Sequence, residues 1–236
     1  MKRKIDKELR KIIFKSLIVT YFILILHSAI FFISAGRLDL YQAWLYFSVI
    51  FAYSTLNIVA LAKFSPELLK QRLLMKREGS KLWDEVLMRT CNLMLMLVLP
   101  FIAGLDIGRF HWSRLSIYFI PLGFLLFIAG GFLTTRAMIE NPYFETTMRI
   151  QEERSHHVIT TGPYKFVRHP GYLGGLLSGI SIPFMIGSIF AFIPAGVYVL
   201  LMIIRTWLED KTLQKELNGY LEYTKRTRHR LFPGIW

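Results

Sequence analysis

The chain has 236 residues, of which 53% are hydrophobic and 19% are charged, and its formal net charge is +13. Its apolar residues lie in long runs without charge, which excludes an ordinary soluble domain and predicts one polytopic membrane unit. The basic excess raises the alternative of a nucleic-acid-binding protein, which the positions of the cations test.

Four apolar runs without Asp, Glu, Lys or Arg precede residue 136. Three of them reach the roughly 20 residues that a spanning helix needs, and Val86–Met88 can lengthen the shorter third run. Residues 1–135 are therefore predicted to form an N-terminal membrane region with four spans. The runs are Ser16–Gly36, Leu40–Ala62, Thr90–Leu105 and Leu115–Thr135.

A short helix is predicted between the second and third runs. Ser65 can act as its N-cap, Pro66 suits the first helical position, and Glu67 places an acid in the first turn. Four leucines then recur at helical spacing: Leu68, Leu69, Leu73 and Leu74. This pattern predicts an amphipathic helix near residues 65–80 that lies on the membrane surface.

The second part of the chain, residues 136–236, combines a long polar connection with two short spans. The connection, Arg136–His169, is long enough to suggest a functional loop. The apolar run Pro170–Ile204 is too long for one span and predicts a helical hairpin that breaks at Gly187-Ser188. A charged helix is expected after Trp207, with Leu213, Leu217, Tyr220, Leu221 and Thr224 on one face.

The predicted fold is therefore all-α and integral to the membrane, with about six transmembrane helices. In this topology only Arg37, Arg109 and Arg114 face the side opposite the termini, so the other 26 of 29 Lys and Arg residues (29 − 3) share one side. The positive-inside rule then places both termini in the cytoplasm. The basic excess is a topology signal, so we expect membrane lipids and no nucleic acid as partners.

The second part of the chain contains several candidate functional residues. Arg205 and Glu209 stand four residues apart and share a helix face, although a snorkelling arginine followed by a solvated acid is the plainer alternative. His156, His157 and His169 match no metal-ligand spacing, so we expect hydrogen-bonding roles and no metal. The single cysteine, Cys91, can form no intrachain disulfide.

Two separated motifs resemble the isoprenylcysteine carboxyl methyltransferase family. The first is Gly162-Pro163-Tyr164 followed four residues later by His169-Pro170-Gly171-Tyr172, with Arg168 before the histidine. The second is Arg205-x3-Glu209-Asp210, continued by Gly219-Tyr220 and Arg230–Pro233. The resemblance covers about residues 145–236. The segments Ser65–Arg72 and Ala103–Ser113 also resemble bacterial members, which implies a bacterial inner membrane. Membrane methyltransferases that act on phospholipid amines share the same C-terminal pattern.

This resemblance implies S-adenosylmethionine as the cofactor, held by the cytoplasmic loop, the helical hairpin and the C-terminal helix. Carried over by position, Arg205 and Glu209 are the catalytic pair, Arg205 binds the substrate and Glu209 also contacts the cofactor. Gly171 replaces the serine or methionine common in the family, so it could contribute only its backbone. The remaining implied cofactor contacts are Gln151, His156, His157, Val158, Ile159, Tyr164, His169, Pro170, Gly171 and Tyr172.

The implied reaction is methyl transfer to an amphiphilic, lipid-like or lipidated acceptor, for which a carboxylate is the first expectation. A carboxylate is already a nucleophile, so catalysis would consist mainly of positioning, and an arginine such as Arg205 can hold it bidentately. A phospholipid amine is the alternative acceptor and would need a general base, with His156 or Glu209 as candidates. An NADPH-dependent enzyme resembling sterol reductases and a non-catalytic scaffold or small transporter are further alternatives.

Overall fold

The protein is a bundle of helices, seen here in a computed structural model that describes residues 7–73 and 79–236. Five helices within these residues are long and apolar enough to span a membrane. They are α1 (Lys7–Ala35), α2 (Tyr41–Phe64), the continuous helix Leu82–Phe110, the helix Ile117–Glu140 that contains α6 (Ile120–Glu140), and α8 (Phe192–Glu216). The helix α7 (Pro170–Ile186) is also apolar but shorter, with 17 residues. The predicted all-α membrane fold is therefore confirmed.

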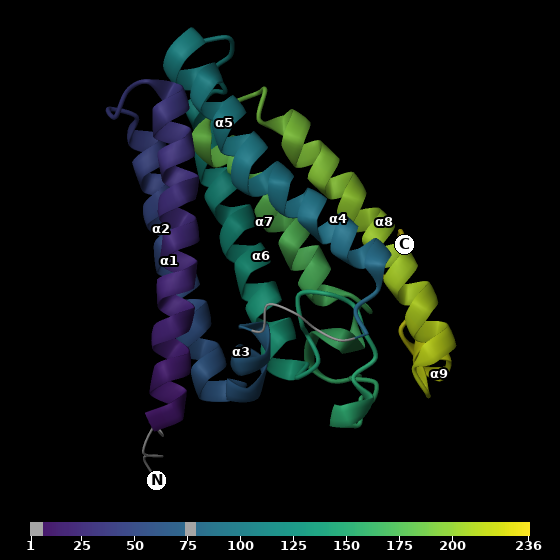
Figure 1. Cartoon of the computed structure of the whole chain (residues 1–236). Helices are drawn as coiled ribbons and strands as arrows, with labels where there is room; N and C mark the ends of the chain where they lie inside the picture. Colours follow the sequence, from purple (N-terminus) through teal and green to yellow (C-terminus); the bar gives the residue numbers. More distant parts are fainter. Residues whose placement is uncertain (1–6, 74–78) are drawn as a thin grey trace.

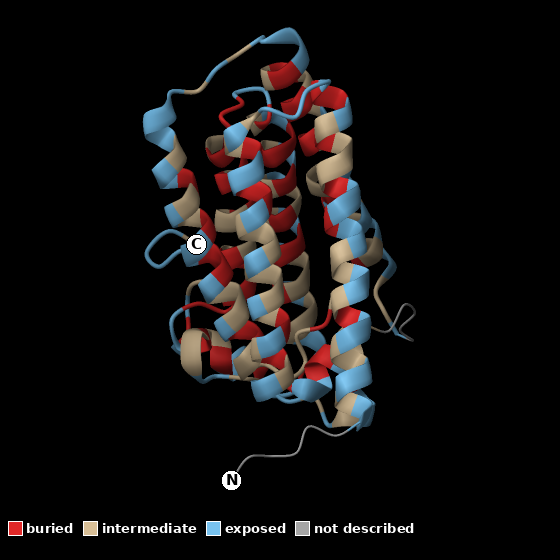
Figure 2. Ribbon diagram, turned by 90° about the vertical axis from the view of Figure 1, so that its left-hand side faces the viewer, coloured by how far each residue is buried: buried red, intermediate tan, exposed pale blue. Residues whose placement is uncertain are grey.

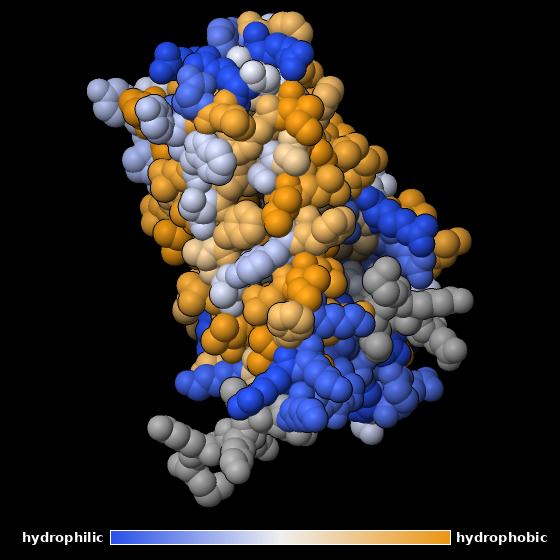
Figure 3. Space-filling view, turned by 60° about the vertical axis from the view of Figure 1, so that its left-hand side comes forward, coloured by the Kyte–Doolittle hydropathy of each residue, from blue (hydrophilic) through white to orange (hydrophobic). Residues whose placement is uncertain are grey.

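The long helices run side by side, and the short elements gather at the end of the bundle near the N-terminus (Figure 1). This end carries α3 (Pro66–Arg72), α9 (Tyr220–Arg226) and the loop between α6 and α7. The loop contains two 3₁₀ turns, η4 (Glu152–Arg154) and η5 (Gly162–Lys165). Hydrophobic side chains cover most of the middle of the face shown in Figure 3, and hydrophilic side chains gather at its two ends.

The core of the bundle lies where α1, α2, α5 (Leu99–Gly104), α6 and α7 meet. Its buried residues include Phe31, Tyr46, Leu99, Phe127 and Met185, whereas many outward-facing apolar side chains are exposed (Figure 2). Such an exposed apolar surface suits contact with lipid rather than water. The helices α6 and α7 approach each other closely at Gly130 and Gly174, because a Cβ atom at Gly130 would lie 2.5 Å from the carbonyl oxygen of Gly174.

The third span is longer than the sequence predicts. It comprises α4 (Leu82–Leu93), η1 (Met94–Val98), α5 (Leu99–Gly104) and η2 (Leu105–Phe110), where η1 and η2 are π-helical. Pro100 explains the first π segment, since it has no amide hydrogen to donate to the preceding turn. The predicted run Thr90–Leu105 ends too early, because the helix continues to Phe110 and includes Asp106, which accepts hydrogen bonds from Ser113 and Ser188.

Several predicted boundaries are confirmed. The helix α3 begins at Pro66, although the Ser65 side chain makes no capping hydrogen bond, and Leu68 and Leu69 are buried. They pack beneath the bundle rather than facing outward, and Leu74 lies outside the described residues. The hairpin breaks at Gly187, where the backbone φ of 86° favours glycine.

The C-terminal helix differs from the prediction of a single charged helix. The helix α8 ends at Glu216, and Gly219, with a φ of 82°, redirects the chain into α9. The last residues then fold back against the start of α7, where the backbone amides of Arg168 and His169 donate to the carbonyls of His229 and Arg230. This return places the C-terminal segment behind the residues of the first family motif.

Candidate functional site

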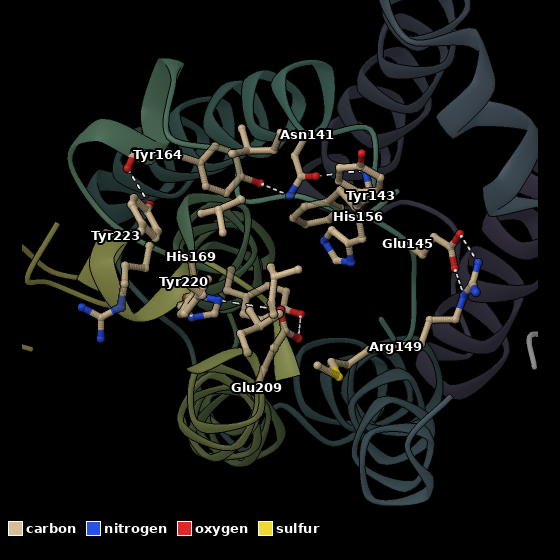
Figure 4. A pocket seen from close by; sticks show the side chains of 18 of the residues that line it. Asn141, Tyr143, Glu145, Arg149, His156, Tyr164, His169, Glu209, Tyr220 and Tyr223 are labelled. Atoms are coloured by element: carbon tan, nitrogen blue, oxygen red, sulfur yellow. Dashed lines mark hydrogen bonds and ion pairs between the residues drawn. The ribbon is translucent and has the colours of Figure 1, made fainter. Parts of the chain in front are cut away.

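A pocket lies at the end of the bundle that carries the α6–α7 loop, between this loop and the C-terminal half of α8. Its empty volume is about 730 Å³ when the open solvent at its mouth is included. Figure 4 shows side chains from these segments around the hollow. The lining residues used below are Asn141, Tyr143, Phe144, Glu145, Arg149, His156, His157, Val158, Ile159, Tyr164, Arg168, His169, Tyr172, Arg205, Glu209, Tyr220 and Tyr223.

Nine of the residues expected from the sequence line this pocket. They come from three separate stretches of chain: His156, His157, Val158 and Ile159; Tyr164, His169 and Tyr172; and Arg205 and Glu209. The pocket therefore brings the two family motifs together. The fold causes this convergence. Because α7 and α8 form a hairpin, the second motif on α8 returns to the end of the bundle where the first motif begins α7.

Three expected cofactor contacts lie behind the lining. Gln151 is buried and fastens its own loop, because Nε2 donates to the carbonyl of Tyr143 at 2.9 Å and Oε1 accepts from Arg154 at 2.6 Å. Pro170 begins α7. A Cβ atom at Gly171 would overlap the ring of Phe144, so the glycine allows that ring to reach the pocket.

Tyrosine rings form one wall. Asn141 Nδ2 donates to the Tyr164 hydroxyl at 3.2 Å, and the Tyr223 hydroxyl donates to the carbonyl of Tyr164 at 2.6 Å (Figure 4). Burial raises the pKa of Tyr164 far above its usual value and the pKa of Tyr223 to about 12. Both phenols therefore stay protonated at neutral pH, so they offer apolar faces and hydrogen bonds rather than a base.

The histidines beside the wall are held by Tyr143. The rings of His156 and Tyr143 lie 4.2 Å apart between centroids, and the Tyr143 hydroxyl lies 2.9 Å from His157 Nδ1. Burial, with smaller contributions from the neighbouring His157 and Arg149, lowers the pKa of His156 to about 4. His156 is thus neutral near pH 7. Within residues 7–73 and 79–236, no three His, Cys, Asp or Glu side chains are grouped to hold a metal.

Arg205 is held by a residue that the sequence did not single out. Its Nε and Nη2 atoms lie 2.6 and 3.1 Å from the two carboxylate oxygens of Asp84, in the first turn of α4. The guanidinium also lies over the Tyr172 ring, 4.6 Å from its centroid. The bidentate edge expected to grip the acceptor is therefore occupied by Asp84, and such a grip would require this carboxylate to move.

Glu209 is less tightly paired. Its Oε2 accepts a 2.5 Å hydrogen bond from the Tyr172 hydroxyl, while His169 Nδ1 and Arg205 Nη2 lie 3.8 and 4.0 Å from its carboxylate. The side chain retains 16% exposure toward the pocket. The other acid of the lining, Glu145, pairs with Arg149 at 3.0 and 3.2 Å. Glu209 is consequently the lining carboxylate best able to meet a cation from the ligand.

Asp210 faces away from the pocket and organises its back. Its buried carboxylate accepts from Arg168 Nε and Nη2 at 2.7 and 3.0 Å and from Arg230 Nε at 2.9 Å. The Tyr220 hydroxyl donates to it at 3.0 Å, and His169 Nε2 lies 3.3 Å away. The second motif contains Asp210 but does not predict this role, although an acid next to Glu209 in a spanning helix is a signal for one.

The sequence model of the phospholipid methyltransferase family matches residues 118–218. This stretch contains α6, the α6–α7 loop, α7 and α8, and hence most of the pocket. The match supports a membrane methyltransferase related to the isoprenylcysteine carboxyl methyltransferase family. It covers less than half of the chain and leaves out α4 and Asp84. No curated protein matches the chain.

Proposed function

We propose that the protein is an integral membrane methyltransferase that uses S-adenosylmethionine and acts on an amphiphilic acceptor, with a carboxylate as the leading acceptor class. The observation that carries the proposal is the convergence of both motifs in one pocket at the end of the hydrophobic bundle. The family match over residues 118–218 supports the same chemistry. The acceptor would reach this pocket from the lipid phase, so membrane lipids are expected as surroundings and as substrates.

The side chains that line the pocket suit S-adenosylmethionine. This cofactor supplies a methyl group on a positively charged sulfur. Glu209 offers a partly exposed carboxylate for a cationic part of the ligand, and the neutral rings of Tyr164 and Tyr172 can face a sulfonium or an adenine. His169, at the N-cap position of α7, and the His156–Ile159 segment would hold the polar remainder.

The pocket residues would contribute chiefly by holding the donor and the acceptor in line. Such positioning removes a large part of the activation barrier for a displacement reaction. Arg205 would place its positive charge beside the acceptor while Asp84 and Tyr172 hold its plane fixed. A carboxylate acceptor needs no proton removed. In that case the pocket would require no general base, in agreement with the protonated phenols.

An amine acceptor is the second candidate, and the pairing of the lining arginines favours it. Arg149, Arg168 and Arg205 each contact a carboxylate, of Glu145, Asp210 and Asp84 respectively. A pocket whose cations are neutralised in this way attracts an anionic acceptor less strongly. An ammonium acceptor must lose a proton before attack, and Glu209 would then be the acceptor of that proton.

The deciding experiment is a calorimetric titration of the detergent-solubilised protein with S-adenosylmethionine, S-adenosylhomocysteine and NADPH. We expect both sulfur compounds to bind in the micromolar range, on the order of −8 kcal/mol. Transfer of a radiolabelled methyl group to a prenylcysteine or to phosphatidylethanolamine would then separate the two acceptor classes. Saturable binding of NADPH without binding of either sulfur compound would instead assign a reductase.

The cation distribution supports an orientation in which the pocket, both termini and the α6–α7 loop face the cytoplasm. The donor is water-soluble and made in the cytoplasm, so this orientation gives it direct access to the mouth of the pocket. The bacterial inner membrane is the proposed location.

A further inference from the structure

Asp84 is fully buried, lies outside the lining of the pocket, and joins three parts of the protein. From the first turn of α4 it contacts Arg205 on α8 through both carboxylate oxygens. Its Oδ2 also accepts a hydrogen bond from the backbone amide of Met148 in the α6–α7 loop at 2.6 Å. The helix α4 belongs to the part of the chain outside the family match, so nothing in that match assigns a role to this carboxylate.

Arg205 stands between two carboxylates. Asp84 holds it at 2.6 and 3.1 Å, whereas Glu209, one helical turn further along α8, lies 4.0 Å from Nη2. A third contact, from Nη2 to the carbonyl of Thr146 at 3.2 Å, and the ring of Tyr172 keep the guanidinium in this position. Since the attraction between charges rises as distance falls, the present geometry directs Arg205 toward Asp84.

Removal of the Asp84 charge would change this balance. Arg205 is itself buried, with 4% of its side chain exposed, and a buried cation without a partner is strongly unfavourable. Glu209 is the carboxylate within reach on the same helix face, at spacing i, i+4. The guanidinium would therefore turn to Glu209 and neutralise the acid that faces the pocket.

We propose that Asp84 is a positioning residue that holds Arg205 away from Glu209, so that Glu209 keeps its negative charge for the cationic part of the methyl donor. This inference rests on the proposed function, in which Glu209 meets the donor. It assigns the front half of the chain a direct influence on donor binding, exerted through one buried ion pair.

The test is a double-mutant cycle read out by calorimetric titration with S-adenosylmethionine, whose sulfonium carries the charge. Asp84→Asn keeps the side-chain shape and should weaken donor binding by about tenfold, the loss expected for a charge-assisted contact. Adding Arg205→Gln removes the cation that would capture Glu209. The double variant should therefore bind the donor more tightly than Asp84→Asn alone, and Asp84→Asn should have less than about twofold effect in the Arg205→Gln background.

Asp106 provides the matched control. It is also a fully buried aspartate that accepts several hydrogen bonds, but it lies at the opposite end of the bundle, beside Ser188. Asp106→Asn should lower thermal stability without changing donor affinity. If Asp84→Asn does not fold, comparison of Arg205→Gln with the double variant still tests the absence of an Asp84 effect once Arg205 is removed.

The outcomes separate the inference from the proposed function. No donor binding by the wild-type protein would refute the proposed function. Wild-type binding that Asp84→Asn leaves intact, or a loss that Arg205→Gln fails to restore, would overturn the positioning role of Asp84. Equal losses in Asp84→Asn and Asp106→Asn would show a general effect of stability and would also overturn it.

Discussion

Arg168 and Asp210 form a buried, two-point ion pair that connects the start of α7 to α8, with Nε–Oδ1 and Nη2–Oδ2 distances of 2.7 and 3.0 Å. The side chains are 5% and 0% exposed, and Arg168 Nη1 also donates to the carbonyls of Thr227 and Arg228. The pair therefore anchors the C-terminal segment as well as the hairpin, and it determines where His169 enters the pocket.

Asp210→Asn should destabilise the protein by about 3–5 kcal/mol, because it leaves Arg168 buried without a counter-charge. Reversible unfolding in mixed micelles would measure the change. Asp39→Asn is the control, since its pair with Arg37 is exposed at the far end of the bundle and should leave the unfolding midpoint unchanged. A midpoint for Asp210→Asn equal to that of the control would contradict the anchoring role.

The close contact of α6 and α7 predicts a strong effect of bulk at Gly174. A side chain there would overlap Thr134 and the carbonyl of Gly130, so Gly174→Leu should force the two helices apart and cost about 1–3 kcal/mol or more. Because α7 carries Tyr172 into the pocket, donor affinity should fall as well. Gly196→Leu, where nothing lies within 4 Å of the added Cβ atom, should be neutral in both titration and unfolding.

How far the sequence predicts this fold depends on the kind of interaction. Long uncharged runs and the Ser65-Pro66-Glu67 signal identify the helices and the start of α3, because hydropathy and helix initiation are local. The uncharged run Thr90–Leu105 stops before Asp106, because an acid at the end of a span normally meets water, whereas the helix continues to Phe110. Ser188, the partner of Asp106, lies 82 residues away and appears only when the bundle packs.

In the site, too, local sequence patterns are predictable, whereas contacts between residues far apart in the chain are not. The residues matched through the two motifs converge in one pocket, because their spacing reflects the hairpin that joins them. Asp84 gave no signal, as it is a lone acid at the start of a helix and its partner Arg205 is 121 residues away. The break between α8 and α9 was also missed, since the leucine pattern continues smoothly through Leu217 while Gly219 redirects the backbone.

The proposed orientation can be tested by labelling single cysteines with a membrane-impermeant maleimide. Thr160→Cys, in the exposed α6–α7 loop, should react only when the cytoplasmic face is accessible. Leu38→Cys, which is 65% exposed in the wild-type turn between α1 and α2, should react in intact cells. The native Cys91 is 1% exposed and serves as the internal control for background labelling. The reverse pattern would place the pocket on the outer side.

The pH dependence of stability should reflect His156, whose pKa is lowered by burial from 6.5 to about 4. Between these two values the unfolded chain binds a proton that the folded protein does not, so the folded state loses stability as the pH falls from about 6.5 to about 4. His156→Gln should reduce that loss. Unfolding midpoints of both proteins at pH 7.5 and 4.5 provide the measurement, and equal pH dependence would show that His156 does not titrate in this way.

The last prediction separates the roles of Glu209 and Arg205. Glu209→Gln removes the charge that faces the pocket and should weaken donor binding by about tenfold. Glu216 is an exposed acid on the same helix that pairs with Lys81, so Glu216→Gln should leave donor binding unchanged.

Arg205→Lys keeps a positive charge but loses the planar contacts with Asp84 and Tyr172. Single-turnover transfer should then fall by about tenfold or more while donor affinity stays within about twofold. Equal losses of donor affinity in Glu209→Gln and Arg205→Lys would refute this division of roles, and wild-type transfer in both would refute the site itself.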